Sequence, residues 1–137
     1  MIFNFNQKNK DGEEIIKICA LLIHAAKIDE NFSLKEEEII KQTLLNLNVK
    51  SDNLSSILTQ AKIIEEDSNQ ILDFTREVKN MENEKKIHIV EALWRIIYSD
   101  KEADIYETNL MRRLTALLYI DNKIIGDIKE KIKKENT

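Results

Sequence analysis

The segment Ile15-Ile-Lys-Ile-Cys-Ala-Leu-Leu-Ile-His-Ala-Ala-Lys-Ile28 is the most apolar stretch of the chain. Its apolar side chains lie nearly all round a helix, which is typical of a helix at the centre of a bundle. The stretch is too short to span a bilayer, and it carries two lysines and a histidine. We therefore predict a buried core helix over roughly 12–28, preceded by an N-terminal lead at 1–11.

An apolar periodicity of three to four residues continues from this helix to the C-terminus and predicts further helices. No stretch of useful length alternates as a β-strand would. The pattern predicts an all-α fold of about seven helices in a single domain. The six later helices are expected to begin at Ser33, after Ser51, near Ser68, at about residue 83, at Asp104 and near Asp121.

Composition narrows the classes of function. The chain has 137 residues, a net charge of −4, two glycines, no proline and one cysteine. Its only basic cluster, Lys129 to Lys134, is interspersed with glutamate and is read as a solvated helix face, so no nucleic acid is expected as a partner.

Two glycines make a Gly-rich phosphate loop almost impossible, and no nucleophile–base pair is visible. Without a signal peptide at Met1, a cytoplasmic protein is expected, with membrane association only through partners.

The sequence also repeats itself after 71 positions. Leu22 then falls on Leu93, Asp29 on Asp100 and Leu47 on Leu118. This register predicts two related helix–loop–helix halves, at 12–62 and 85–133, joined by a connector at 63–84.

Each half contains an acidic loop, Asp29-Glu-Asn-Phe-Ser-Leu-Lys-Glu36 and Asp100-Lys-Glu-Ala-Asp-Ile-Tyr-Glu107. Clustered oxygen ligands from a loop suit a hard divalent cation, and calcium is the favoured ion. Oxygen-bearing side chains stand at relative positions 1, 3, 5 and 8, namely Asp29, Asn31, Ser33 and Glu36, then Asp100, Glu102, Asp104 and Glu107.

The same residues have an interpretation without metal. Ser33 with Glu36, and Asp104 with Glu107, fit the capping box that satisfies helix-end donors. The loops are not EF-hands, because Leu34 and Ile105 replace the glycine at position 6, and the glutamate at position 12 is also missing. Capping leaves Asp29, Asp100 and Glu102 without a structural role.

The segment Leu93-Trp-Arg-Ile-Ile-Tyr-Ser-Asp-Lys-Glu-Ala-Asp-Ile-Tyr-Glu107, followed by Leu110-Met-Arg-Arg-Leu114, resembles the tellurite-resistance TerB family. The family pattern has a leucine–tryptophan pair, a tyrosine before the loop aspartate, a tyrosine–glutamate pair and an arginine pair. Residues 21–45 are similar to the family's first loop, Phe74-Thr-Arg76 to its connector, and the resemblance covers roughly 12–133.

The resemblance implies a TerB-like helical fold and a role in stress response or tellurite resistance together with a protein partner. It also implies a divalent-cation site with ligands at Asp29, Glu36, Asp100 and Glu107. The sequence departs from the pattern where Glu30 and Lys101 replace a glycine after each loop aspartate. Loss of a glycine can change the loop's shape, and Lys101 adds a positive charge beside the second loop.

Two functions follow as hypotheses. The first is a non-enzymatic TerB-like protein that binds a divalent cation through its acidic loops and couples it to a partner. The second is a protein–protein interaction module in which the loop acids only cap helices. Cys19, His24, Trp94 and Tyr98 are expected to be core or boundary residues and His88 exposed, whereas a buried polar pocket near Trp94 would favour an enzyme.

Overall fold

The computed structural model describes residues 2–27, 33–67, 72–100, 105–118 and 120–135. Side chains are described from Gly12 onward, except those of residues 100, 105–108 and 117. These ranges contain helices and turns and no β-strand. The all-α prediction is therefore confirmed.

Seven α-helices and two short 3₁₀ helices make up the described ranges. They are α1 Ile2–Ala26, α2 Leu34–Asn46, η1 Ser51–Asn53, α3 Leu54–Asp67, α4 Leu72–Lys79, α5 Asn83–Ile97, η2 Tyr98–Asp100, α6 Ile105–Leu118 and α7 Asn122–Glu135. The later helices begin within a few residues of the predicted positions. The first one differs, because α1 already starts at Ile2 and includes the segment expected to be a lead.

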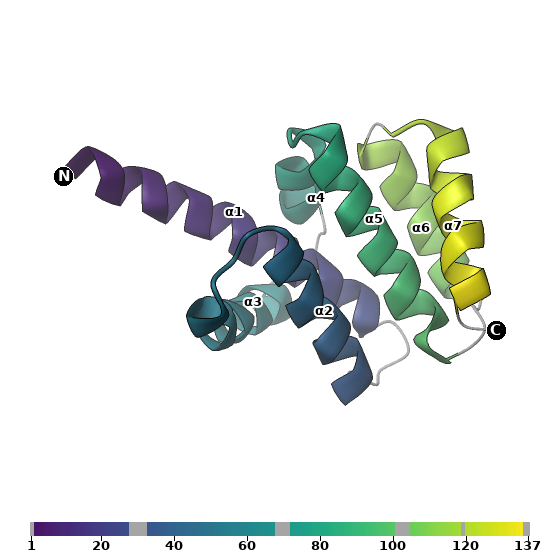
Figure 1. The fold of residues 1–137 in the computed structure, drawn as a ribbon, viewed down its shortest axis with the longest axis horizontal. Coiled ribbons are helices and arrows are strands. Elements are labelled where there is room, and N and C mark those ends of the chain that lie inside the picture. The colour runs from purple at the N-terminus through teal and green to yellow at the C-terminus, as the bar shows by residue number, and fades with distance from the viewer. Residues whose placement is uncertain (1, 28–32, 68–71, 101–104, 119, 136–137) are drawn as a thin grey trace.

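Helix α1 passes through the middle of the fold. Every residue from Ile18 to Ile23 is buried, and the helix packs against α2, α3, α4 and α5. In Figure 1 its N-terminal part projects from the bundle, while its C-terminal part lies among the other helices. The all-round apolar character of this C-terminal part is thus explained by neighbours on several sides.

Helix α5 is the second central helix. It carries buried apolar residues on several faces and packs against α1, α2, α6 and α7. Figure 1 shows α1, α2 and α3 on one side of the molecule and α5, α6 and α7 on the other. The short helix α4 contacts α1, α5 and α6 and thereby connects the two groups.

The turn after α2 is closed by its own backbone. Asn48 has a positive φ of 71°. Its N–H donates to the carbonyl of Leu45, and the N–H of Val49 donates to the carbonyl of Leu44, each at 3.0 Å. This pattern is a Schellman closure, in which asparagine accepts the left-handed conformation that glycine usually fills.

In the described part of the chain, no helix is both long and apolar enough to cross a membrane. Helix α1 is long enough, with 25 residues, but its first two turns are polar and include Asn4, Asn6, Gln7 and Lys8.

Candidate functional site

The described residues that flank the two acidic loops lie together. The C-terminal end of α1, the N-terminal end of α2 and the C-terminal end of α5 reach the same edge of the molecule, which we call the loop end (Figure 1). At this edge the Lys35 ammonium donates a hydrogen bond of 3.0 Å to the backbone carbonyl of Ser99. Lys35 stands near the end of the first loop, two residues after Ser33, and Ser99 directly precedes Asp100.

The last turn before the second loop is held locally. The Ser99 hydroxyl donates to the carbonyl of Ile96 at 2.7 Å, and Ser99 is buried. The carbonyl that accepts from Lys35 therefore belongs to a residue that is fixed by its own helix. A lysine at a helix C-terminus also interacts favourably with the negative end of the helix dipole.

The start of α2 is a complete capping box. The Ser33 hydroxyl accepts from the backbone N–H of Glu36 at 3.2 Å, and Glu36 Oε1 accepts from the backbone N–H of Ser33 at 2.9 Å. The predicted cap in the first half is confirmed. Glu36 is only 3% exposed, so one of its oxygens is committed to the cap in a place that water hardly reaches.

A buried acid supports the end of α1. Glu65 of α3 is 8% exposed, and its carboxylate lies 2.8 Å from Lys27 Nζ and 3.4 Å from His24 Nδ1. The hydrogen bond that Lys27 donates to Glu65 raises the pKa of Lys27. The last described side chain before the first loop is therefore a lysine whose charge is already paired.

Of the predicted metal ligands, Glu36 is the one whose side chain the structure describes. Asp29, Asn31, Glu102 and Asp104 lie outside the described residues, as do the side chains of Asp100 and Glu107. Among the described side chains, no three His, Cys, Asp or Glu residues come together as a metal site. The structure thus brings the flanks of the two loops together and leaves the proposed ligand set as a prediction.

The other candidates lie in or near the core. Trp94 is 4% exposed and its ring stacks on Tyr98 with centroids 5.8 Å apart. Burial raises the pKa of the Cys19 thiol to about 12, as expected of a thiol that packs as a small apolar residue. His24 is half-buried as a boundary residue, whereas His88, expected to be exposed, is half-buried too.

Two charged residues of the interior were missed in the sequence. Glu65 shares a helix face with the buried residues Leu58 and Ala61, and Lys86 shares one with Ile89 and Leu93. The spacing of three, four and seven residues would have placed both on core faces. The Lys35–Ser99 contact has no such signal, because it joins residues 64 positions apart.

The chain is a small all-α domain in which the described flanks of two acidic loops lie at one edge. It is distinct from the EF-hand proteins, because its loops lack the glycine and the glutamate of an EF-hand. The model of the family described as tellurite resistance protein TerB matches residues 16–130, which is most of the chain. The chain belongs to the TerB family. It has no match among curated proteins or among solved structures.

Proposed function

We propose that this TerB family protein binds one divalent cation at the loop end, with calcium favoured, through carboxylates of both acidic loops. Asp29 and Asp100 are the principal ligands, and Glu102, Asp104, Glu107 and Glu36 are the further oxygen donors. The protein acts without catalysis, in tellurite resistance or another stress response, and passes the state of its cation site to a protein partner.

The observation that supports a shared site is the hydrogen bond from Lys35 to the Ser99 carbonyl. It joins Lys35, near the end of the first loop, to Ser99, which directly precedes the second, so these described residues at the loops lie close to one another. Calcium takes six to eight oxygen ligands, more than four side chains of one loop supply, and two loops together meet that number. Glu36 contributes less than the others because its Oε1 already accepts from Ser33.

Isothermal titration calorimetry with calcium, magnesium, zinc and manganese tests this proposal. We expect one ion per chain, and we expect either Asp29→Asn or Asp100→Asn to weaken binding at least tenfold. Asp52→Asn is the matched control, because Asp52 is an exposed acid of η1 and not part of either loop. Two ions per chain, with each variant losing one, would contradict a shared site, and no heat with any of the four ions would contradict metal binding.

The capping box at Ser33 favours a second candidate, a protein–protein interaction module in which the loop acids have no ion to bind. Next to this cap, Leu34 is 85% exposed and is available for a contact with a partner. In this case a chelator changes neither the melting temperature nor the binding of partners.

Both candidates share a prediction about the cap itself. Ser33→Ala removes the acceptor for the Glu36 N–H and is expected to lower stability by about 1 kcal/mol in metal-free buffer. Ser33→Asp keeps an acceptor and should retain most of the stability. Chemical denaturation of the three proteins measures the difference, and equal stability of Ser33→Ala and the parent would show that the cap contributes nothing.

A further inference from the structure

A cavity of about 630 Å³ opens between α6 and α7, on the side of α5 that carries Trp94. We call it the α6–α7 groove. Its apolar wall includes Trp94, Met111 and Ile125, and Arg112, Thr115, Asn122 and Lys129 add polar groups. Sites for small molecules usually measure about 300–1,000 Å³ and combine an apolar lining with a few polar groups. The groove has this size, and apolar and polar groups share its surface.

The charged residues that line the groove are all positive. Arg112 and Lys129 line it, and no acid is among its lining residues. Neither cation takes part in the ion pairs found among the described residues. The Lys129 ammonium lies 5.4 Å from the centre of the Trp94 ring, so it stands over the apolar wall. An anionic group carried by an apolar body would complement both features.

Gly126 is a second observation that favours a ligand. It lies in the middle of α7 and lines the groove. Glycine inside a helix costs about 1 kcal/mol relative to alanine. A Cβ added at Gly126 would meet nothing within 4 Å, so the packing of the protein does not require glycine there. A residue without a side chain keeps the groove open and lets a ligand approach the backbone.

Trp94 supplies a third observation. Its Nε1 is buried and has no hydrogen-bond partner within the described part of the protein. An unpaired buried donor costs about 1–3 kcal/mol, and such groups call for an explanation such as a ligand or water. This donor belongs to a ring that lines the groove.

We propose that the α6–α7 groove binds a small organic carboxylate with an apolar body. The carboxylate pairs with Arg112 and Lys129, and the body lies along the floor of the groove, which the exposed edges of the otherwise buried Met111, Ile125 and Trp94 form. The site is separate from the proposed cation site, because none of its lining residues belongs to the acidic loops.

Trp94 is the only tryptophan of the chain, so its fluorescence reports on the groove directly. Titration with octanoate, an apolar carboxylate that does not absorb in this range, should give a saturable change. Octanol and octylamine are the neutral and cationic counterparts, and we expect each to bind at least tenfold more weakly. Octanol binding as tightly as octanoate would overturn the anion site, and no saturable change with octanoate would overturn the groove as its site.

Substitutions locate the binding. Arg112→Gln and Lys129→Gln should each weaken octanoate binding about tenfold, whereas Arg113→Gln and Lys133→Gln, on the same two helices but outside the groove, should not. Gly126→Leu fills the groove and should abolish binding. Gly12→Leu is its matched control, since Gly12 is also a helical glycine with open space around it. Circular dichroism checks that every variant is folded.

Unchanged binding in folded Gly126→Leu would overturn the proposal. A short peptide with a C-terminal leucine tests the other source of an apolar carboxylate. If that peptide binds at least a hundredfold tighter than octanoate, the groove holds a protein's C-terminus and the small-molecule assignment is wrong. Comparable or weaker binding of the peptide supports the small carboxylate.

Discussion

Cys19 shows how the core determines the chemistry of a single residue. The thiol is fully buried in α1, and desolvation is the larger influence on its pKa, with Lys62 acting in the opposite direction. Its pKa rises from 9.0 to about 12, so the thiolate that reacts with oxidants and metals is suppressed at neutral pH. The expectation of an inert core cysteine follows from the same apolar surroundings that define the helix.

This burial predicts a loss of stability in alkali. The folded protein holds the Cys19 proton more tightly than the unfolded chain, so the stabilisation is complete below pH 9 and is lost as the pH rises toward 12. By pH 10.5 the loss should reach about 2 kcal/mol. Urea unfolding under reducing conditions, at pH 8 and pH 10.5, measures it.

Cys19→Ala is the control for this prediction. The pKa of Tyr98 is raised by burial and by Glu130, so Tyr98 also lowers the stability of the folded protein in alkali. Because this happens in both proteins, the effect cancels in the comparison. The parent should be more stable than Cys19→Ala at pH 8, and the gap should narrow at pH 10.5. A constant gap would mean that the thiol does not titrate differently in the two states.

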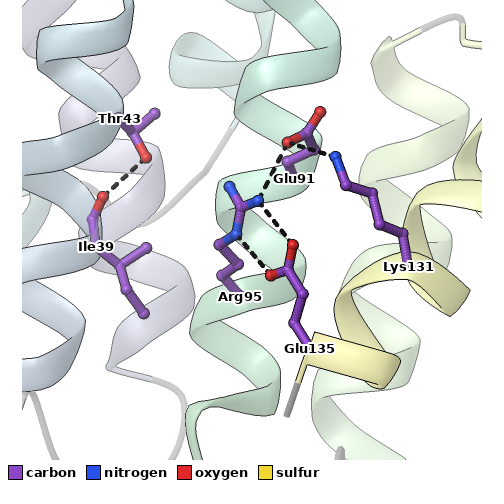
Figure 2. A network of polar contacts seen from close by, with 6 residues as sticks. All are labelled: Ile39, Thr43, Glu91, Arg95, Lys131 and Glu135. Carbon is purple, nitrogen blue, oxygen red and sulfur yellow. Dashed lines mark hydrogen bonds and ion pairs between the residues drawn. The ribbon is translucent and has the colours of Figure 1, made fainter.

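At the scale of elements, helix α7 is fastened to α5 by a polar cluster as well as by apolar contacts. Figure 2 shows Arg95 between Glu91 of its own helix and Glu135 of α7. Arg95 meets Glu135 through two hydrogen bonds of 3.2 and 3.3 Å, and Lys131 lies 3.7 Å from Glu91. Since these side chains are partly exposed, water and salt weaken the pairs.

A double-mutant cycle with Arg95→Ala and Glu135→Ala should give a coupling of about 0.5 kcal/mol at low salt. The coupling should shrink in 1 M salt, where charges are screened within about 3 Å. Hydrogen exchange in the last turns of α7 should accelerate in either single variant. Unaltered exchange there would show that the apolar residues Ile125, Ile128 and Ile132 hold α7 without the cluster.

The helices were predictable from the sequence because each buries a periodic apolar face, and Ser33 was predictable because a capping box is local. Contacts between distant residues were not. The core-facing acid Glu65 reaches His24 and Lys27, and Lys86 donates to the carbonyl of Leu118 at 3.1 Å. Periodicity places such charges on buried faces, but the partner depends on how helices far apart in the chain cross.

The same distinction applies to the candidate site. The sequence pointed to two acidic loops, and the positions of Leu34 and Ile105, the first residues of α2 and α6, preserve the 71-residue offset. The duplication itself stays a prediction. Whether the loops approach one another depends on the packing of α2 against α5, which no local pattern encodes. Lys35 became relevant to the site only through that packing.

For the whole molecule, Lys35 distinguishes the two proposed functions. Its ammonium joins the flanks of the loops and also places a positive charge near the proposed ion. Lys35→Met should therefore lower the stability of the metal-free protein by about 1 kcal/mol, through the lost charge-assisted hydrogen bond. It should also tighten calcium binding about two- to fivefold, because a charge roughly 10 Å from a divalent ion in water contributes up to about 1 kcal/mol.

Calorimetry with calcium and metal-free thermal unfolding give the two readouts, and Lys41→Met, farther along α2, is the matched control. A cation site predicts that Lys35→Met changes both quantities, in opposite directions, while Lys41→Met changes the affinity little. An interaction module predicts a lower melting temperature with no calcium heat in either variant. Weaker calcium binding in Lys35→Met would contradict electrostatic repulsion, and would instead mean that the ion needs the two loop flanks held together by this side chain.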